Sequence, residues 1–380
     1  MIISNLTCLL INGAVVTRSA QRILDQARGY GLLTTDELVR RTGLTRSDVT
    51  STVEALLATG VLRERADQRR GDGGTPLQID PDRFATIGIH LGRRLTTVGI
   101  GDLAGRVVST RSVSHHEGVE RNLDRITPWA HRMLAELPGR VAVSAGVVAP
   151  WRDLGLDPDR TSATLASGLG LPVAAAHHLA ALALTETRQH SSGRTLFVYG
   201  RDTVGFAVAE DRESSTTVTR VGRLTHVATG SATPCDCGRQ GCLEVTVGDH
   251  AVALRAHRDG LITEDAIGEL YTAAIAGNFR AHALLTQRAE TLGAVAAQVQ
   301  RTVRPDRVIL AGQAFTSYRP ALEVITRSYA STVTDPAPVT FSRLGGGMQS
   351  SSACTIALGP VYADPLAVVG DRVGQPVGGR

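Results

Sequence analysis

The chain has 380 residues, of which 42% are hydrophobic and 4% aromatic, so two or three domains are possible and their cores must be mostly aliphatic. The formal net charge of +4 is too small to indicate a nucleic-acid partner by itself. Five cysteines, three of them close together, fit a protein of the reducing cytoplasm.

The first 17 residues contain an apolar run from Leu6 to Val16, interrupted by Asn12 and Gly13. The run lacks a charged flank and is too short to span a bilayer. We predict a disordered leader or a misassigned start rather than a signal peptide. No other stretch is long and apolar enough for a membrane helix, so no membrane partner is expected.

Residues 18–80 are predicted to form three helices followed by a hairpin. A hydroxyl residue with an acid three positions later opens the second helix at Thr34 and the third at Thr45. Gly43 lies in the short turn between these helices, and Gly60 ends the third. Two helices joined by a short glycine turn are typical of a helix-turn-helix.

The exposed start of the third helix is the predicted reading surface for double-stranded DNA. In this motif, the N-terminal residues of the second of the two helices reach base edges in the major groove. The candidate contacts are Thr45, Arg46, Ser47, Thr50 and Ser51.

A wing is predicted after the third helix, with strands at residues 61–64 and 76–79. Arg69 and Arg70 at its tip are placed to neutralise phosphates or probe the minor groove. Turn spacing, caps and wing together favour a winged helix-turn-helix that binds DNA. The alternative is a helical hairpin for protein contacts, with the two arginines in a solvated turn.

From residue 84 the pattern changes to strands alternating with helices, which favours an α/β domain with mixed sheets. Glycine, proline and valine dominate residues 359–380, which we predict to be a flexible tail. Strands are expected at residues 87–91, 96–100, 107–113, 141–148, 172–176, 195–199, 204–209 and 308–310. Helices are expected near residues 119–136, 178–188, 247–258, 264–276 and 278–303.

A cysteine loop follows the middle of the chain, with Cys235, Cys237 and Cys242 inside eight residues and His226 nine residues upstream. Glycines between the thiols can adopt left-handed conformations that turn the sulfur atoms toward one centre. The first two cysteines are too close for an ordinary disulfide, and any disulfide would leave the third thiol odd. Three cysteines and one histidine form a closed tetrahedral set, so we predict structural Zn²⁺.

The run Gly222 to His226, followed by Cys-x-Cys-Gly-x-x-Gly-Cys-Leu-Glu, resembles the zinc signature of the ROK family of repressors, open reading frames and sugar kinases. The cysteine part matches at every fixed position, but Arg223 and Thr225 replace the expected Glu and Gly. The resemblance implies a duplicated actin-like, hexokinase-type fold over residues 84–358. Family regulators carry a DNA-binding domain where residues 18–80 lie, followed by a Gly-Arg-Pro-like element, here residues 73–76.

The residues that the resemblance assigns to catalysis in ROK kinases are replaced here. His90-Leu91-Gly92-Arg93 stands for the phosphate-binding Asp-x-Gly-Gly, and His177-His178 stands for the Asn-Asp pair that supplies the base. Arg223 stands for the Glu that holds the sugar. Because phosphate site, base and sugar ligand are lost together, we predict no catalytic residues and no kinase activity.

The replacements also predict a different ligand. His177, His178 and Arg223 would line the cleft and suit a sugar phosphate or another anion. The alternative is an eroded pocket that binds nothing and supports dimerisation.

Taken together, the sequence predicts a cytoplasmic transcriptional regulator, in particular a repressor, that binds DNA as a homodimer or homotetramer and senses a sugar-derived or anionic effector. The competing hypothesis is an ATP-dependent sugar kinase with an appended DNA-binding domain. A third possibility is a pure scaffold.

Overall fold

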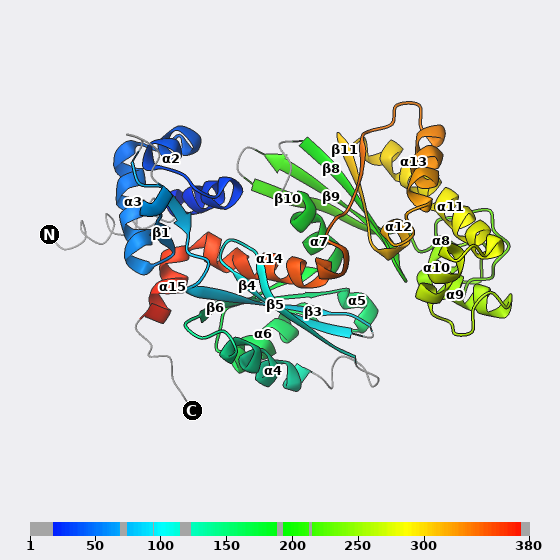
Figure 1. The fold of residues 1–380 in the computed structure, drawn as a ribbon, viewed down its shortest axis with the longest axis horizontal. Helices are drawn as coiled ribbons and strands as arrows, with labels where there is room; N and C mark the ends of the chain where they lie inside the picture. Colours follow the sequence, from blue (N-terminus) through cyan, green and yellow to red (C-terminus); the bar gives the residue numbers. More distant parts are fainter. Residues whose placement is uncertain are drawn as a thin grey trace. The chain divides into compact units, whose positions relative to one another are not determined.

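The computed structural model describes residues 18–68, 74–93, 95–114, 123–187, 193–212 and 215–373. The chain divides into two compact units, one formed by Met1–Ala181 with Gly347–Arg380 and the other by Leu182–Gly346. Figure 1 shows the elements of both. Among the described residues, no helix is both long enough and apolar enough to cross a membrane.

The N-terminal segment, residues 18–79, has the predicted order of elements. Residues 18–30 are helical, and α2 (Thr35–Thr42), α3 (Arg46–Thr59), β1 (Leu62–Glu64), the short helix η1 (Ala66–Gln68) and β2 (Leu77–Ile79) follow. Thr34 and Glu37 form the predicted capping box, and the Thr45 hydroxyl caps α3. The antiparallel hairpin pairs Leu62 with Ile79. The predicted caps and strands are therefore confirmed.

The N-terminal segment shares one hydrophobic core with the rest of the first unit. Its buried side chains Ile23, Leu38 and Leu56 belong to the same cluster as Leu103 and Tyr362. Because burial of apolar surface is the main stabilising contribution to folding, this shared core holds the segment against the body of its unit.

The first unit contains a five-stranded mixed sheet in the order β5-β4-β3-β6-β7. Strands β3, β4 and β5 form an antiparallel meander, and β6 and β7 continue parallel to β3. Ile126 of α4 and Leu165 of α6 pack on one face of the sheet, and α14 covers the other. The elements are β3 (Phe84–Leu91), β4 (Leu95–Asp102), β5 (Val107–Ser114), α4 (Leu123–Ala135), β6 (Val141–Ala149), α5 (Trp151–Leu154), α6 (Pro158–Leu169), β7 (Val173–His177), α7 (His178–Thr187) and α14 (Met348–Ala363).

Glycines allow α14 to lie very close to this sheet. A Cβ atom added at Gly88 would lie 2.4 Å from the backbone nitrogen of Cys354, and one at Gly146 would lie 2.4 Å from that of Ala357. The Ser144 hydroxyl donates to the Ala357 carbonyl at 2.6 Å. A larger residue at either glycine would push helix and sheet apart.

The second unit repeats the strand order in the sheet β10-β9-β8-β11-β12, again with an antiparallel meander followed by two parallel strands. Two strands that the sequence did not predict, β10 and β12, lie at its edges. The strands are β8 (Gly193–Gly200), β9 (Val204–Arg212), β10 (Ser215–Arg223), β11 (Arg307–Ala311) and β12 (Val339–Phe341). The helices are α8 (Leu243–Val247), α9 (Asp249–Arg258), α10 (Ile267–Ile275), α11 (Phe279–Val303), α12 (Gln313–Thr316) and α13 (Ala321–Thr332).

A buried arginine organises the helices of the second unit. Arg288 of α11 donates to the Val247 carbonyl at 2.8 Å and to the Tyr271 hydroxyl at 2.9 Å, and it pairs with the Asp249 carboxylate. The Arg288 guanidinium is buried and has partners on several sides, as a buried charge must, whereas the Oδ2 atom of Asp249 has no hydrogen-bond partner among the described residues.

The predicted flexible tail is wrong for residues 359–373. Helix α14 continues to Ala363, and α15 (Pro365–Val373) follows. Val361, Tyr362 and Val369 are buried in the core of the N-terminal segment. The tail composition suggested disorder, but Pro365 occupies the first helical position, where proline is tolerated, and the valines fill a core supplied by distant residues. Residues 1–17 and 374–380 lie outside the described residues.

Candidate functional site

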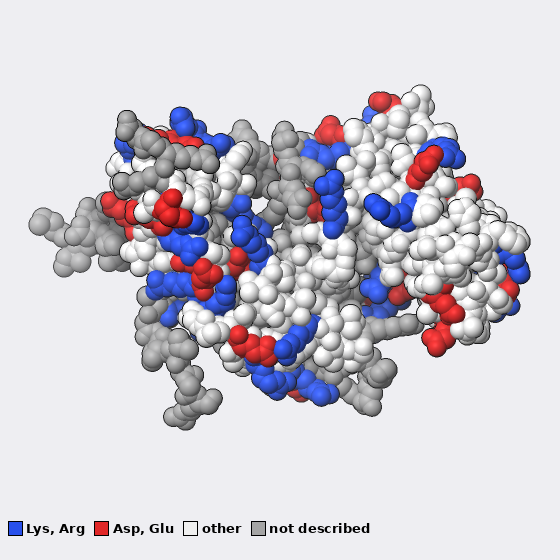
Figure 2. Space-filling view, viewed as in Figure 1, with Lys and Arg blue, Asp and Glu red and all other residues white. Residues whose placement is uncertain are grey.

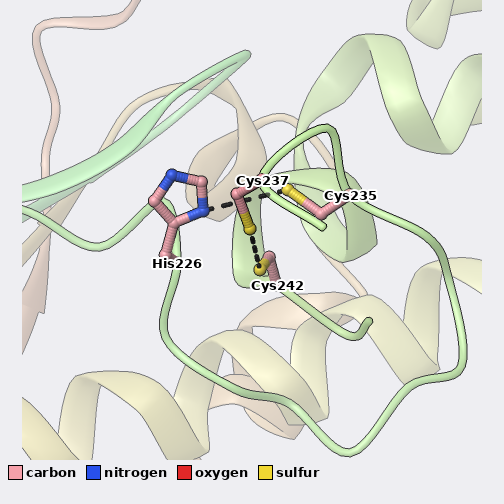
Figure 3. A group of neighbouring side chains, drawn as sticks. All are labelled: His226, Cys235, Cys237 and Cys242. Carbon is pink, nitrogen blue, oxygen red and sulfur yellow. Dashed lines mark hydrogen bonds between the residues drawn. The ribbon is translucent and has the colours of Figure 1, made fainter. Parts of the chain in front are cut away.

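The four predicted metal ligands lie together in the second unit (Figure 3). The Nδ1 atom of His226 is 3.8 Å from the sulfur of Cys235, and the sulfur atoms of Cys237 and Cys242 are 3.6 Å apart. All four candidate ligand atoms lie within 4.8 Å of one another. Zinc–sulfur bonds of tetrahedral sites place neighbouring sulfur atoms about 3.8 Å apart, so this donor set fits Zn²⁺.

Local sequence builds the loop that carries these ligands. Gly238 and Gly241 have φ angles of 83° and 65°, the left-handed conformations expected of them. The amide of Cys235 donates to the Arg239 carbonyl at 2.9 Å, which closes the turn. Hydrogen bonds from Arg239 lower the pKa of the Cys237 thiol to about 6, which favours the thiolate that binds metal.

Two polar atoms near the predicted metal ligands have no hydrogen-bond partner among the described residues. The Oε2 atom of Glu244 and the hydroxyl of Thr225 are buried without a hydrogen bond among the described residues. The Glu244 amide donates to the Thr225 carbonyl at 3.1 Å, so the two residues are neighbours. An unpaired buried carboxylate oxygen is costly, which marks Glu244 as a candidate ligand contact. Glu244 was not among the site residues predicted from the sequence, although it is the last fixed residue of the cysteine motif.

Three histidines gather in the first unit, at the carboxyl ends of parallel strands. His90 lies near the end of β3, His177 ends β7 and His178 begins α7. The ring centroids of His90 and His178 are 6.1 Å apart, and those of His177 and His178 are 5.7 Å apart. Ligands of open α/β sheets bind at this edge, and the sequence analysis had not grouped His90 with the other two.

The two predicted ligand-binding histidines differ in chemistry. His177 accepts a hydrogen bond at Nδ1 from the Leu179 amide at 3.2 Å, so its neutral ring carries a proton on Nε2. His178 is only 9% exposed, and burial, followed by the charges of His90 and His177, lowers its pKa well below the usual value. His178 is therefore neutral at pH 7, which argues against its predicted role as a cation for an anionic ligand.

Arg223 ends β10 in the second unit, opposite Gly205. The histidine cluster belongs to the first unit, so a cleft shared by all three predicted ligand residues remains a prediction. In the first unit, Arg93 of the altered phosphate motif pairs with Asp153 at 3.5 Å.

The predicted DNA contacts of α3 lie on one exposed surface. Thr45, Arg46, Ser47, Thr50 and Ser51 are all exposed at the N-terminal end of the helix. The guanidinium of Arg46 pairs with the carboxylate of Asp36 in α2 at 2.7 Å. Arg69 and Arg70 lie outside the described residues. Basic and acidic side chains are interspersed on the face shown in Figure 2.

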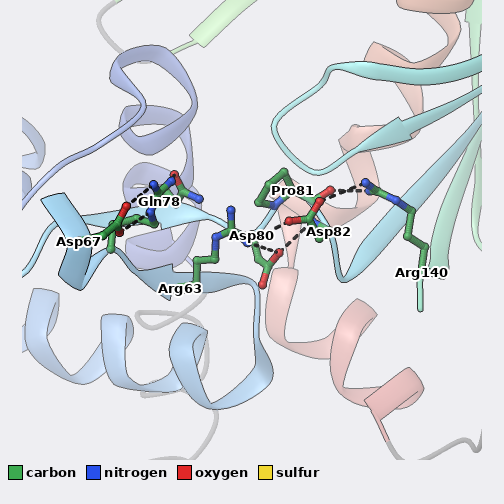
Figure 4. Close-up of polar contacts among 8 residues, drawn as sticks. Arg63, Asp67, Gln78, Asp80, Pro81, Asp82 and Arg140 are labelled. Atoms are coloured by element: carbon green, nitrogen blue, oxygen red, sulfur yellow. Dashed lines mark hydrogen bonds and ion pairs between the residues drawn. The ribbon is translucent and has the colours of Figure 1, made fainter. Parts of the chain in front are cut away.

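Polar contacts fasten the connection between β2 and β3 (Figure 4). Arg63 of β1 lies 3.6 Å from the carboxylate of Asp80 and 2.9 Å from that of Asp82. From the other side, Arg140 pairs with Asp82 at 3.3 Å and donates to the Pro81 carbonyl. The connection is therefore held on both sides within the first unit.

A second contact joins the helix of residues 18–30 to the sheet. The Nε atom of Arg28 donates to the Ala104 carbonyl at 3.2 Å, and its guanidinium lies 5.6 Å from the centre of the Tyr362 ring. The Tyr362 hydroxyl donates to the Leu103 carbonyl at 2.9 Å. Arginine over an aromatic face adds an electrostatic attraction to the apolar packing.

Comparisons with known proteins agree with this architecture. The ROK family model matches residues 86–353. The chain is 30% identical to "Transcriptional regulator Rv0485" of Mycobacterium tuberculosis, over 92% of this chain and 87% of the relative. It is 22% identical to "DNA-binding transcriptional dual regulator NagC" of Escherichia coli, over 77% of this chain and 79% of the relative.

Solved structures show the same fold. A ROK family transcriptional regulator, described as a homologue of the E. coli MLC protein, has a TM-score of 0.73 and 19% identity, covering 94% of this chain and all of the other. A ROK glucokinase from Streptomyces griseus has a TM-score of 0.60 and 21% identity, covering 72% of this chain and 99% of the other. The chain belongs to the ROK family and has its α/β, kinase-type fold.

Proposed function

We propose that this chain is a cytoplasmic DNA-binding transcriptional regulator, in particular a repressor. In this proposal its kinase-like domain does not catalyse phosphoryl transfer. The observation that carries the proposal is the exposed, capped face of α3 on a segment that shares a core with a ROK body. The names of the mycobacterial and E. coli relatives support it.

In this proposal, residues 18–79 form a winged helix-turn-helix. Helix α3 enters the major groove with Arg46, Ser47, Thr50 and Ser51 toward the bases, and the β1–β2 hairpin is the wing. A single winged helix-turn-helix domain rarely binds DNA with sufficient affinity alone. A homodimer or homotetramer would therefore place two copies of α3 on half-sites about one helical turn apart.

The loss of kinase chemistry is supported by the residues at the altered motifs. His90, His177 and Arg223 occupy positions where the family's kinases need carboxylates or an amide. Transfer to a sugar hydroxyl requires a base within hydrogen-bond reach and a held phosphate. His178, although neutral, is buried, and Arg93 is engaged with Asp153.

The effector that the geometry favours is a hydroxyl-bearing, sugar-derived molecule rather than a simple anion. Glu244 and Thr225 offer unpaired oxygen atoms to ligand hydroxyls, and the carboxylate of Glu244 would repel an anion. Zn²⁺ held by His226, Cys235, Cys237 and Cys242 would have a structural role, because a closed four-ligand set leaves no position for water.

The test has two parts. The full chain is incubated with random-sequence duplex DNA, and bound sequences are selected and read; recovery of a two-fold motif supports the proposal. The same preparation is then assayed with ATP and a panel of hexoses. Sugar phosphorylation that disappears in His178→Ala would establish the kinase alternative. An absence of both DNA binding at low salt and sugar phosphorylation would favour the scaffold hypothesis.

A further inference from the structure

The predicted reading helix carries little positive charge. Among the 14 residues of α3, Arg46 is the only basic side chain, and Asp48 and Glu54 are acidic. A helix with more negative than positive charges gains little from general attraction to phosphates. Arg46 is therefore the only side chain of α3 that can donate a paired hydrogen bond to a guanine.

Arg46 stands at an unfavourable place for a cation. It is the first residue of α3, where the positive end of the helix dipole disfavours a guanidinium. The carboxylate of Asp36, in the first turn of α2, offsets this by accepting a hydrogen bond from Nη1 of Arg46 at 2.7 Å. The consecutive helices α2 and α3 thus place the acidic Asp36 beside Arg46, the basic side chain of the predicted reading surface.

This ion pair contributes little to folding. The side chains of Arg46 and Asp36 are 67% and 57% exposed, and exposed pairs are weak. The buried side chains Leu38, Val49 and Leu56 already hold α2 and α3 in one core. The consequence of the pair is therefore the orientation of the guanidinium, since a bond at Nη1 removes rotamers that free arginine would sample.

We propose that Asp36 is a positioning residue that aims Arg46 at one guanine in the major groove. The bond to Asp36 uses one of the five donors of the guanidinium. The donors that remain can form the paired contact with O6 and N7 that distinguishes guanine from the other bases. The inference rests on the proposed function, because it requires that α3 reads DNA.

The experiment measures base preference with the full-length protein. Sequences selected by the parent should contain one position where guanine is required, and Arg46→Ala should reduce that preference by about 5- to 150-fold. Asp36→Asn, which keeps the shape and removes the charge, should reduce the preference at the same position by about 2- to 5-fold, the range that an exposed ion pair can supply. Adding Asp36→Asn to Arg46→Ala should have no further effect on it.

The readout is the ratio of affinities for matched duplexes that differ at that position. Loss of an acid strengthens binding to all DNA alike, so affinity alone does not discriminate. Glu323→Gln is the matched control, because Glu323 forms an exposed pair with Arg327, also at 2.7 Å, on α13 of the second unit. This control should leave the ratio unchanged.

Three results would overturn the inference. In the first, Asp36→Asn leaves the affinity ratio for guanine unchanged. In the second, Asp36→Asn weakens binding to all sequences equally. In the third, it changes the ratio as much in the Arg46→Ala background as in the parent. A parent protein that binds no DNA would instead refute the proposed function, and this inference with it. A change in melting temperature alone would indicate that the pair only joins α2 to α3.

Discussion

The two five-stranded sheets have the same strand order and directions, but they are packed by different means. In the first unit, α14 lies directly on Gly88 and Gly146, where any side chain would meet the helix backbone. In the second unit, a comparably close approach lies between two helices, because a Cβ atom at Gly293 of α11 would lie 2.5 Å from the Ile325 carbonyl of α13. The shared topology thus does not determine where glycines bring two elements into close contact.

The two units also differ in how polar groups are used. The second unit contains the cluster of four predicted metal ligands and the buried Arg288–Asp249 pair. The first unit contains the histidine cluster and shares its core with the N-terminal segment. Because each of these polar groups lies within one unit, a substitution in one of them should change the stability of that unit alone.

The largest effect is expected from loss of the metal-ligand cluster. Cys237→Ser should abolish zinc binding and destabilise the second unit by several kcal/mol, since metal binding contributes directly to folding. Zinc content and thermal unfolding measure this. Cys354→Ala, which removes a buried thiol of the first unit, should leave the zinc content unchanged; equal zinc in parent and Cys237→Ser would contradict the ligand assignment.

The next largest effect is expected from the buried ion pair. Arg288→Ala should destabilise the second unit by about 3–5 kcal/mol, because it leaves the Asp249 carboxylate buried without its partner. Denaturant unfolding provides the measurement. Arg327→Ala, which breaks an exposed pair in the same unit, should cost less than about 1 kcal/mol. Similar losses in the two variants would mean that Arg288 is hydrated in solution.

A smaller effect is expected from crowding the sheet under α14. Gly146→Val should destabilise the first unit by about 1–3 kcal/mol, because the added atoms meet the backbone of Ala357. Gly359→Ala in the same helix has no neighbour within 4 Å and should stabilise it by about 0.5–1 kcal/mol. Hydrogen exchange of β3 and β6 locates the change, and a neutral Gly146→Val would contradict the close approach.

The smallest effect concerns the pH dependence of the first unit. Burial raises the pKa of Asp25 to about 6 from 3.8, despite the opposing charge of Arg28. Because the folded pKa is the higher one, this carboxyl destabilises the fold when ionised, and its unfavourable contribution disappears as pH falls from 7 to 4. Asp25→Asn should stabilise the first unit at pH 7 by about 1 kcal/mol, less than the full pKa shift would give, because Asp25 is only partly buried and the substitution also removes its attraction to Arg28.

Unfolding free energies of Asp25→Asn and the parent, measured at pH 7 and pH 4, test this expectation. The difference between the two proteins should shrink at the lower pH. A difference that grows toward pH 4 would reverse the sign assigned to Asp25.

Local signals account for most of what the sequence predicted correctly. The capping box of Thr34 and Glu37 and the glycine ends at Gly43 and Gly60 act within a few residues, so they appear directly in the sequence. The cysteine loop is similar, because Gly238 and Gly241 set its turns. Most strands of both sheets were predicted from β-type runs, but the edge strands β10 and β12 were not.

The sequence by itself determined the helix boundaries of the N-terminal segment, the α/β class of the body and the turns of the cysteine loop, because the signals for each of these lie among neighbouring residues. Only the tertiary structure decided that residues 359–373 are helical and that His90 joins His178. It likewise decided that Arg46 meets Asp36 and that the Oε2 atom of Glu244 has no hydrogen-bond partner among the described residues. The physical reason is that burial and pairing depend on residues that only the folded chain brings together.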